Sequence, residues 1–113
     1  MPCTFELDVA SGRVSWSDAA RELLFLPEAE PADLGTLMAR IHPREREAVR
    51  QAVMQAVFEC RALTGDFHVV GPDGDVRHVA LRAEVTADTA GRPKRMQGAC
   101  LELARLVDPA RAA

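Results

Sequence analysis

The sequence predicts an α+β fold: a five-stranded antiparallel sheet with short helices and one longer helix packed on one face. Three observations lead to this prediction. Both ends of the chain alternate apolar and polar residues as half-buried strands do, the middle shows helical spacing, and no β-α-β alternation indicates a parallel sheet. The expected order of elements is β-β-α-α-α-β-β-β, in a chain of 113 residues that suits a single domain.

A hairpin is expected at the N-terminal end. Phe5, Leu7 and Val9 alternate with acidic residues over residues 4–9, so that one face of this strand is apolar. A Ser-Gly turn follows, and the alternation resumes over residues 13–16. These two short strands are expected to pair as the first hairpin of the sheet.

Three helices are expected in the middle of the chain. Ser17 is placed to cap a short helix that ends before Pro27, and residues 32–40 can form a second short helix. The longest helix is expected to start at Pro43, because proline suits the first helical position, and to end near Cys60. Its apolar residues recur at steps of three and four, which predicts one face turned to the core.

Three further strands are expected after the helices. Residues 66–70 and 76–86 flank the sequence Gly-Pro-Asp-Gly-Asp, in which proline and glycine provide the backbone angles of a tight turn. A second turn at residues 88–93 leads to the last strand, which is expected over residues 94–103. Successive strands joined by such short turns pair in antiparallel fashion.

Composition and charge bound the class of protein. Apolar residues make up 48% of the chain and charged residues 27%, which is typical of a globular domain. We expect a single domain over residues 1–113, with its core at about residues 4–104 and a tail or the start of a linker at residues 105–113. The net charge of −3 argues against direct nucleic-acid binding.

The expected localisation is cytoplasmic. Cys3, Cys60 and Cys100 are widely spaced and odd in number, which suits a reducing compartment better than a disulfide framework. The start of the chain lacks the basic and apolar regions of a secretory signal peptide. No membrane contact is expected, because no apolar run has the length of about 18 residues that suggests a membrane span.

Four short motifs follow one another along the chain. They are Trp16-Ser17 with Arg21-Glu22-Leu23-Leu24, then Ile41-His42-Pro43, then the strand–Pro-Asp-Gly–strand run from Phe67 to Val79, and finally Gly91-Arg92-Pro93 with Gly98. Their order and spacing together resemble the PAS superfamily, and within it the PAS-fold-3 group. The resemblance extends over about residues 5–103.

This resemblance implies a sensory module with a small cavity between the sheet and the helices. PAS domains typically pass signals to histidine kinases, cyclic-dinucleotide enzymes or helix-turn-helix transcription regulators, so an output domain in the same parent chain is implied. Many PAS domains end their last strand with Asp-Ile-Thr. The matching signal-output residues here are Glu102, Leu103 and Ala104, which keep the carboxylate and lack the threonine hydroxyl.

No catalytic or metal-binding constellation stands out, so an enzyme is not expected. His42 lies at a helix start, and His68 and His78 fall out of phase with the apolar face of their strands, which indicates packing or surface roles. The cysteines and histidines do not cluster as zinc ligands. By resemblance to the PAS domains that bind them, haem and flavin are disfavoured: the longest helix has no histidine, and no Gly-x-Asn-Cys-Arg motif precedes it.

Residues in phase with the inner face are candidates for a ligand-binding cavity. The more conservative interpretation is that they simply fill a packed core. Cys60 and Cys100 are likewise either redox-sensing thiols or inert apolar residues, and inert packing is favoured. The cavity candidates are Leu24, Phe25, Met38, Ile41, Val53, Met54, Val57, Phe67, Val69, Val79, Leu81, Met96 and Cys100.

Two functions remain open at this point. In the first, a small apolar ligand binds in the cavity and biases the strand that leads to the output domain. In the second, the core is solid and the domain is an interaction module that forms a homodimer through the sheet face or the terminal segments. Outer-face apolar residues for such a dimer are Val70, Val76, Ala80 and Leu103.

Overall fold

The computed structural model describes residues 2–26 and 33–106, and it confirms the expected α+β class and order of elements. Five strands form one antiparallel sheet, and three helices precede the last three strands. The elements are β1 (Thr4–Asp8), β2 (Val14–Trp16), α1 (Asp18–Leu23), α2 (Leu34–Arg40), α3 (Pro43–Glu59), β3 (Leu63–Val70), β4 (Val76–Ala87) and β5 (Pro93–Leu106).

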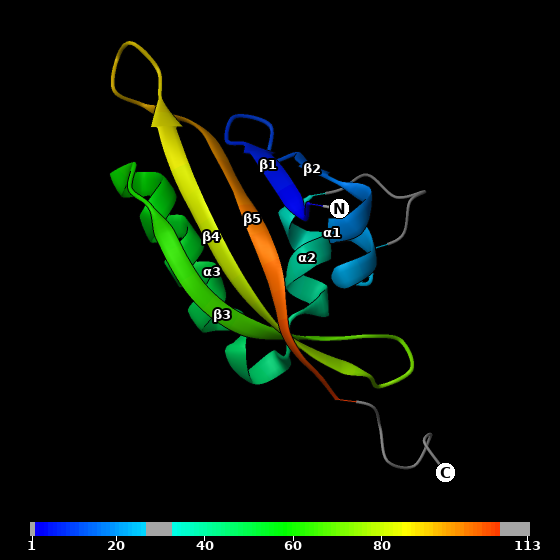
Figure 1. The fold of residues 1–113 in the computed structure, drawn as a ribbon. Coiled ribbons are helices and arrows are strands. Elements are labelled where there is room, and N and C mark those ends of the chain that lie inside the picture. The colour runs from blue at the N-terminus through cyan, green and yellow to red at the C-terminus, as the bar shows by residue number, and fades with distance from the viewer. Residues whose placement is uncertain (1, 27–32, 107–113) are drawn as a thin grey trace.

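The strands lie in the order β2-β1-β5-β4-β3, so the last strand occupies the centre of the sheet. β5 pairs with β1 on one side and with β4 on the other. The long hairpin of β4 and β5 extends beyond the other strands, as Figure 1 shows. One face of the sheet is covered: along β5, Met96 and Cys100 are buried, while Gln97, Ala99 and Leu101 on the opposite face are exposed.

Side-chain caps fix where each helix begins. Ser17 accepts a hydrogen bond from the Ala20 N–H at 3.2 Å, and Asp33 accepts one from the Thr36 N–H at 2.8 Å. His42 caps α3, because its Nδ1 accepts from the Arg44 N–H at 3.2 Å. The expected cap at Ser17 and the expected start of the longest helix at Pro43 are therefore confirmed.

The core is built only from apolar residues. Among the described residues no polar or charged residue is buried. The largest side chains that are fully enclosed are Leu24, Ile41, Val69 and Val79, which come from the helical segment and from the two strands next to it. The core therefore lies between the helices and the inner face of the sheet. No helix among the described residues is long and apolar enough to span a membrane.

The last strand is longer than the sequence predicts. β5 continues to Leu106, where it pairs with Val76, instead of ending near Leu103. A register shift in the β4–β5 pairing falls between His78 and Val79. Backbone pairing with β4 carries the strand past the point where its apolar alternation ends, so the first two residues of the expected tail belong to the sheet. Residues 107–113 lie outside the described residues.

Gly98 provides a test of the central pairing. A Cβ atom on Gly98 would lie 2.1 Å from the backbone oxygen of Arg82, so Gly98→Ala forces β4 and β5 apart. We expect Gly98→Ala to lower the free energy of unfolding by about 2–3 kcal/mol in urea titrations. Gly65→Ala on β3 is the matched control, because its Cβ would meet nothing within 4 Å. Equal stability of the two variants would contradict this packing.

Candidate functional site

A small enclosed space lies between the sheet and the helices. Its volume is about 20 Å³, which is near the minimum needed for one water molecule. Its lining side chains are hydrocarbon or thioether apart from the indole of Trp16, whose Nε1 is buried without a hydrogen-bond partner. The lining residues are Phe5, Leu7, Val14, Trp16, Leu34, Leu37, Val53, Leu63, Leu81 and Met96.

A larger groove of about 290 Å³ runs between α3 and β3 and opens to solvent. Four residues line both the groove and the enclosed space, namely Leu37, Val53, Leu63 and Leu81. These four side chains therefore form the partition between the two spaces. If these four side chains changed rotamer, the groove and the enclosed space would become one cavity. The side chains that move would all be apolar.

One end of the groove is polar. Arg44 and Glu45 at the start of α3 line this end, as does Asp66 on β3, whose carboxylate contacts His78. The rest of the wall consists mostly of alanine, valine and leucine side chains from α3, α2 and β3. The groove thus has the chemistry of a site for a small, mainly apolar molecule: apolar walls and a few polar groups at one end.

The predicted cavity residues differ in how deeply they are buried and in whether they line either space. Most are buried, but the expectation that Met54 lies inside is wrong, because 51% of it is exposed on the outer side of α3. Phe25, Val57 and Leu81 are half-buried. Four of the candidates, Val53, Phe67, Leu81 and Met96, line the groove or the enclosed space. The buried candidates outside these two spaces are Leu24, Met38, Ile41, Val69, Val79 and Cys100.

Sequence reasoning missed the part of the enclosed space that the first hairpin provides. Phe5 and Leu7 on β1 and Val14 and Trp16 on β2 line it. Their alternation already indicated an inward face, so the signal was present. The position of this hairpin beside β5, which brings it to the enclosed space, could not be predicted from the local pattern.

Arg77 on β4 ties the end of α1 to the sheet. Its Nη1 donates hydrogen bonds to the backbone carbonyls of Glu22 at 2.6 Å and Leu23 at 2.9 Å. The guanidinium carbon lies 4.0 Å from the centre of the Phe25 ring, which favours a cation–π interaction. Partial burial, reinforced by the neighbouring Arg105, lowers the pKa of Arg77 from its ordinary value, yet the guanidinium remains charged.

Glu102, the first of the predicted output residues, lies beside Arg77. Its Oε2 is 3.9 Å from the Arg77 Nε, which is too long for a hydrogen bond, whereas Arg105 donates to both of its oxygens at 3.0 and 3.2 Å. Leu103 and Ala104 are exposed. The structure thus places the carboxylate of Glu102 next to the α1 contact, and the role of the three residues in output stays a prediction.

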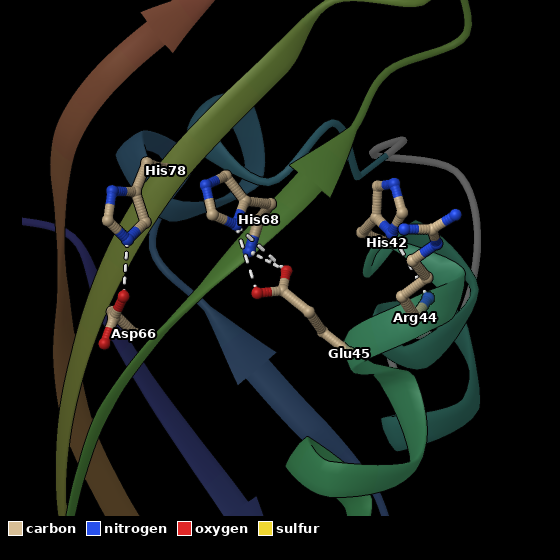
Figure 2. A network of polar contacts seen from close by, with 6 residues as sticks. All are labelled: His42, Arg44, Glu45, Asp66, His68 and His78. Atoms are coloured by element: carbon tan, nitrogen blue, oxygen red, sulfur yellow. Dashed lines mark hydrogen bonds and ion pairs between the residues drawn. The ribbon is translucent and has the colours of Figure 1, made fainter.

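A row of polar side chains crosses the edge strand β3, as Figure 2 shows. Glu45 accepts a hydrogen bond from the His68 backbone N–H at 2.8 Å, and its Oε1 lies 3.0 Å from the His68 Nδ1. The rings of His68 and His78 stack with their centres 4.4 Å apart, and the His78 Nε2 lies 2.5 Å from the Asp66 Oδ2. Glu45 therefore satisfies a backbone donor of the edge strand and joins α3 to it.

Comparison with known proteins identifies the fold family. The family described as PAS fold matches residues 13–100. The chain belongs to the PAS fold family. The predicted resemblance is thereby confirmed, and the enclosed space and groove lie on the inner face of a PAS sheet.

Individual relatives support this assignment. The sensor protein FixL of Bradyrhizobium diazoefficiens is 28% identical over 100 residues, which are 88% of this chain and 20% of that protein. The N-terminal domain of a diguanylate cyclase with PAS/PAC sensor from Marinobacter aquaeolei superposes with a TM-score of 0.83 at 14% identity, covering 91% of this chain and 95% of that one. A LOV protein of Rhodobacter sphaeroides superposes with a TM-score of 0.73 at 12% identity, covering 91% and 60%.

Two of these relatives correct the prediction that disfavoured haem and flavin. That prediction is wrong, because the proteins that this chain resembles include FixL, a haem sensor, and a LOV protein, a member of a flavin-binding class. The enclosed space of about 20 Å³ is smaller than either group, so binding there would require the side chains between this space and the groove to open. Within residues 2–26 and 33–106, no cluster of histidine, cysteine and carboxylate side chains is arranged to hold a metal ion.

The Arg77 contacts predict a stability effect. We expect Arg77→Ala to lower the free energy of unfolding by about 2–3 kcal/mol, because two carbonyls of α1 lose their donor and Phe25 loses its cation–π partner. Urea unfolding measures this. Arg82→Ala, at an exposed position of the same strand, is the control and should change stability by less than about 0.5 kcal/mol. A similar loss in both variants would contradict the assigned role.

Glu45 predicts a pH effect. Partial burial alone would raise the pKa of Glu45, but the hydrogen bonds from the ring and backbone N–H of His68 lower it below its ordinary value. A carboxylate with a lowered pKa stabilises the fold above its unfolded pKa, near 4.5, and this contribution is lost as the pH falls through the folded pKa.

We therefore expect Glu45→Gln to be less stable than the parent chain at pH 7, by up to about 1 kcal/mol, and to lose less stability between pH 7 and pH 4. Urea unfolding at both pH values measures the difference. Glu84→Gln, on the exposed side of β4, should keep the pH dependence of the parent chain. The assignment fails if Glu45→Gln also keeps that dependence.

Proposed function

We propose that this PAS domain is a sensory, non-catalytic module of a bacterial-type signal transduction protein, and that it binds a small apolar molecule between α3 and the sheet. The observation that carries the proposal is the partition of four apolar side chains between the open groove and the enclosed space. A ligand entering from the groove would displace these side chains and bury its apolar surface. Burial of apolar surface supplies the binding free energy.

The signal would leave through β5. Val53 and Leu81 belong to the partition, and Leu81 pairs across the sheet with Cys100 on β5. Glu102 follows two residues later, next to the Arg77 contact with α1. Displacing the partition would therefore shift the strand that carries the output residues relative to α1. Ligand binding can bias such an equilibrium only if the two arrangements differ in affinity for the ligand.

The module is proposed to work within a larger cytoplasmic protein. The chain spans about a fifth of FixL, so its relative is a much longer protein. An output domain in the same parent chain would be a histidine kinase, a cyclic-dinucleotide enzyme or a helix-turn-helix transcription regulator. On this view residues 4–104 form most of the sensory core, and the segment after β5 connects it to the output domain.

A dimerisation module is the second candidate function. Leu101 and Leu103 on β5 are 64% and 50% exposed, which places apolar side chains where a second copy could cover them. Of the outer-face residues expected from the sequence, Leu103 is exposed, and Val70, Val76 and Ala80 are partly exposed. A homodimer through this face would leave the inner groove free. The first function therefore predicts one small molecule bound to each chain, and the second predicts two chains without a bound molecule.

Native mass spectrometry distinguishes the two functions. We expect the purified chain to carry a small molecule that denaturation releases, with an absorption spectrum that would reveal a haem or a flavin. Ala48→Trp fills the groove from an exposed position of α3, and we expect it to abolish the bound mass. Gln51→Trp, one turn along the same helix and outside the groove, is the matched control and should retain it.

An empty dimer whose association is lost in Leu101→Lys would instead support the interaction module. A monomeric chain without a bound molecule would contradict both functions, namely the capture of a ligand during expression and the formation of a dimer. Retention of the bound molecule in Ala48→Trp would place the binding site elsewhere and overturn the groove assignment.

A further inference from the structure

Cys3 and Cys100 face each other across the pairing of β1 with β5. Thr4 lies opposite Ala99 in this register, so the next pair outward is Cys3 with Cys100. The Cys100 backbone N–H donates to the Cys3 carbonyl at 2.9 Å, which makes them a hydrogen-bonded antiparallel pair. In such a pair the Cα atoms lie about 5.5 Å apart, within the range of about 4.4–6.8 Å that a disulfide needs. The Cβ atoms of a hydrogen-bonded pair lie about 5 Å apart or slightly more, beyond the range of about 3.5–4.5 Å of an unstrained disulfide, so a bond here is strained and readily reduced.

Both side chains are on the inner face of the sheet. Cys3 is in phase with the buried Phe5 and Leu7, and it packs against the core. Cys100 is buried and in phase with Met96. Two directly opposed side chains on the same face are neighbours, and here both are free thiols.

The two thiols differ in their access to solvent. Burial, together with the nearby Cys3, raises the pKa of Cys100 to about 12, so Cys100 remains protonated near neutral pH. Cys3 is only partly buried and is the member of the pair that an oxidant in solution reaches first. Cys60 is not part of this pair: it ends α3, and its Sγ lies 4.0 Å from the Gly91 oxygen in the β4–β5 turn.

We propose that Cys3 and Cys100 form a reversible disulfide when the chain meets a peroxide. The Cys3 thiolate attacks hydrogen peroxide: an S–O bond forms, the O–O bond breaks, and the departing hydroxide becomes water. The Cys100 thiol then condenses with the Cys3 sulfenic acid: the Cys100 proton passes to the departing hydroxyl as the S–S bond forms, the S–O bond breaks, and a second water leaves. The two thiols lose two electrons, and the peroxide gains them.

This disulfide fastens the first strand to the strand that carries the predicted output residues. Cys100 lies two residues before Glu102, so the bond restrains β5 directly next to it. It also closes a loop that contains nearly the whole chain, which is the situation in which a cross-link restricts the unfolded state most. Oxidation therefore stiffens the β1–β5 pair independently of any ligand in the groove.

Peptide mapping of the peroxide-treated chain tests the proposal. Trypsin places the three cysteines on separate peptides, at residues 1–13, 51–61 and 96–105. We expect the intact mass to fall by about 2 Da and peptides 1–13 and 96–105 to be linked until dithiothreitol separates them. We also expect the melting temperature of the oxidised chain to rise by about 10 °C or more, and hydrogen exchange at residues 101–104 to slow.

Two variants make the result decisive. Cys60→Ser should keep both the linked peptides and the rise in melting temperature. Cys3→Ser, at a partly exposed position, should fold and lose both. Oxidation of Cys3 to a sulfinic or sulfonic acid without linkage, or a cross-link between two chains through Cys60, would overturn the proposal. A linked chain with unchanged exchange at residues 101–104 would overturn its effect on β5.

Discussion

The pairing of the first strand with the last is the constraint on which the fold depends. β1 and β5 are paired from Thr4 opposite Ala99 to Asp8 opposite Arg95, although more than 85 residues separate each pair along the chain. Without this pairing the N-terminal hairpin would be held only by its contacts with the helices, and β5 would lose its central position. The chain closes a long loop to make these contacts, so their entropic cost falls on the formation of β5 more than on the local hairpins.

Because β5 is central, its inner side chains lie where the two halves of the core meet. Met96 faces the enclosed space beside the first hairpin, and Cys100 lies opposite Leu81, which belongs to the partition with the groove. α3 covers the other half, but only part of its surface is used: Val53 and Ala56 are buried while Phe58 is 87% exposed. The interior is therefore a nearly closed apolar layer that becomes a groove where α3 meets the edge strand.

The elements of this fold were predictable from the sequence because their signals are local. The alternation of Phe67 with Val69 and the proline at the start of α3 are read within a few residues. The site was less predictable, because its members come together only through long-range register. Met54 has the spacing of a core residue and yet faces solvent, since α3 contacts the sheet through a narrower face than its apolar residues suggest. The contact of Arg77 with α1 could not be predicted from the sequence, because its partners are backbone carbonyls of a helix more than 50 residues away.

The four motifs present in the sequence predicted the fold family correctly, whereas the two motifs absent from it were a poor basis for disfavouring haem and flavin. A family is defined by features that its members share, such as the Ile-His-Pro element, where His42 caps α3 and its backbone N–H bonds to the His68 carbonyl at 2.8 Å. That contact holds the start of α3 against the edge strand. It is part of the fold and does not depend on a bound ligand. Contacts to a ligand would instead come from the apolar side chains between α3 and the sheet. For this reason the fold of the chain follows from its motifs, whereas the size of the ligand proposed for it depends on how far the partition of Leu37, Val53, Leu63 and Leu81 can open.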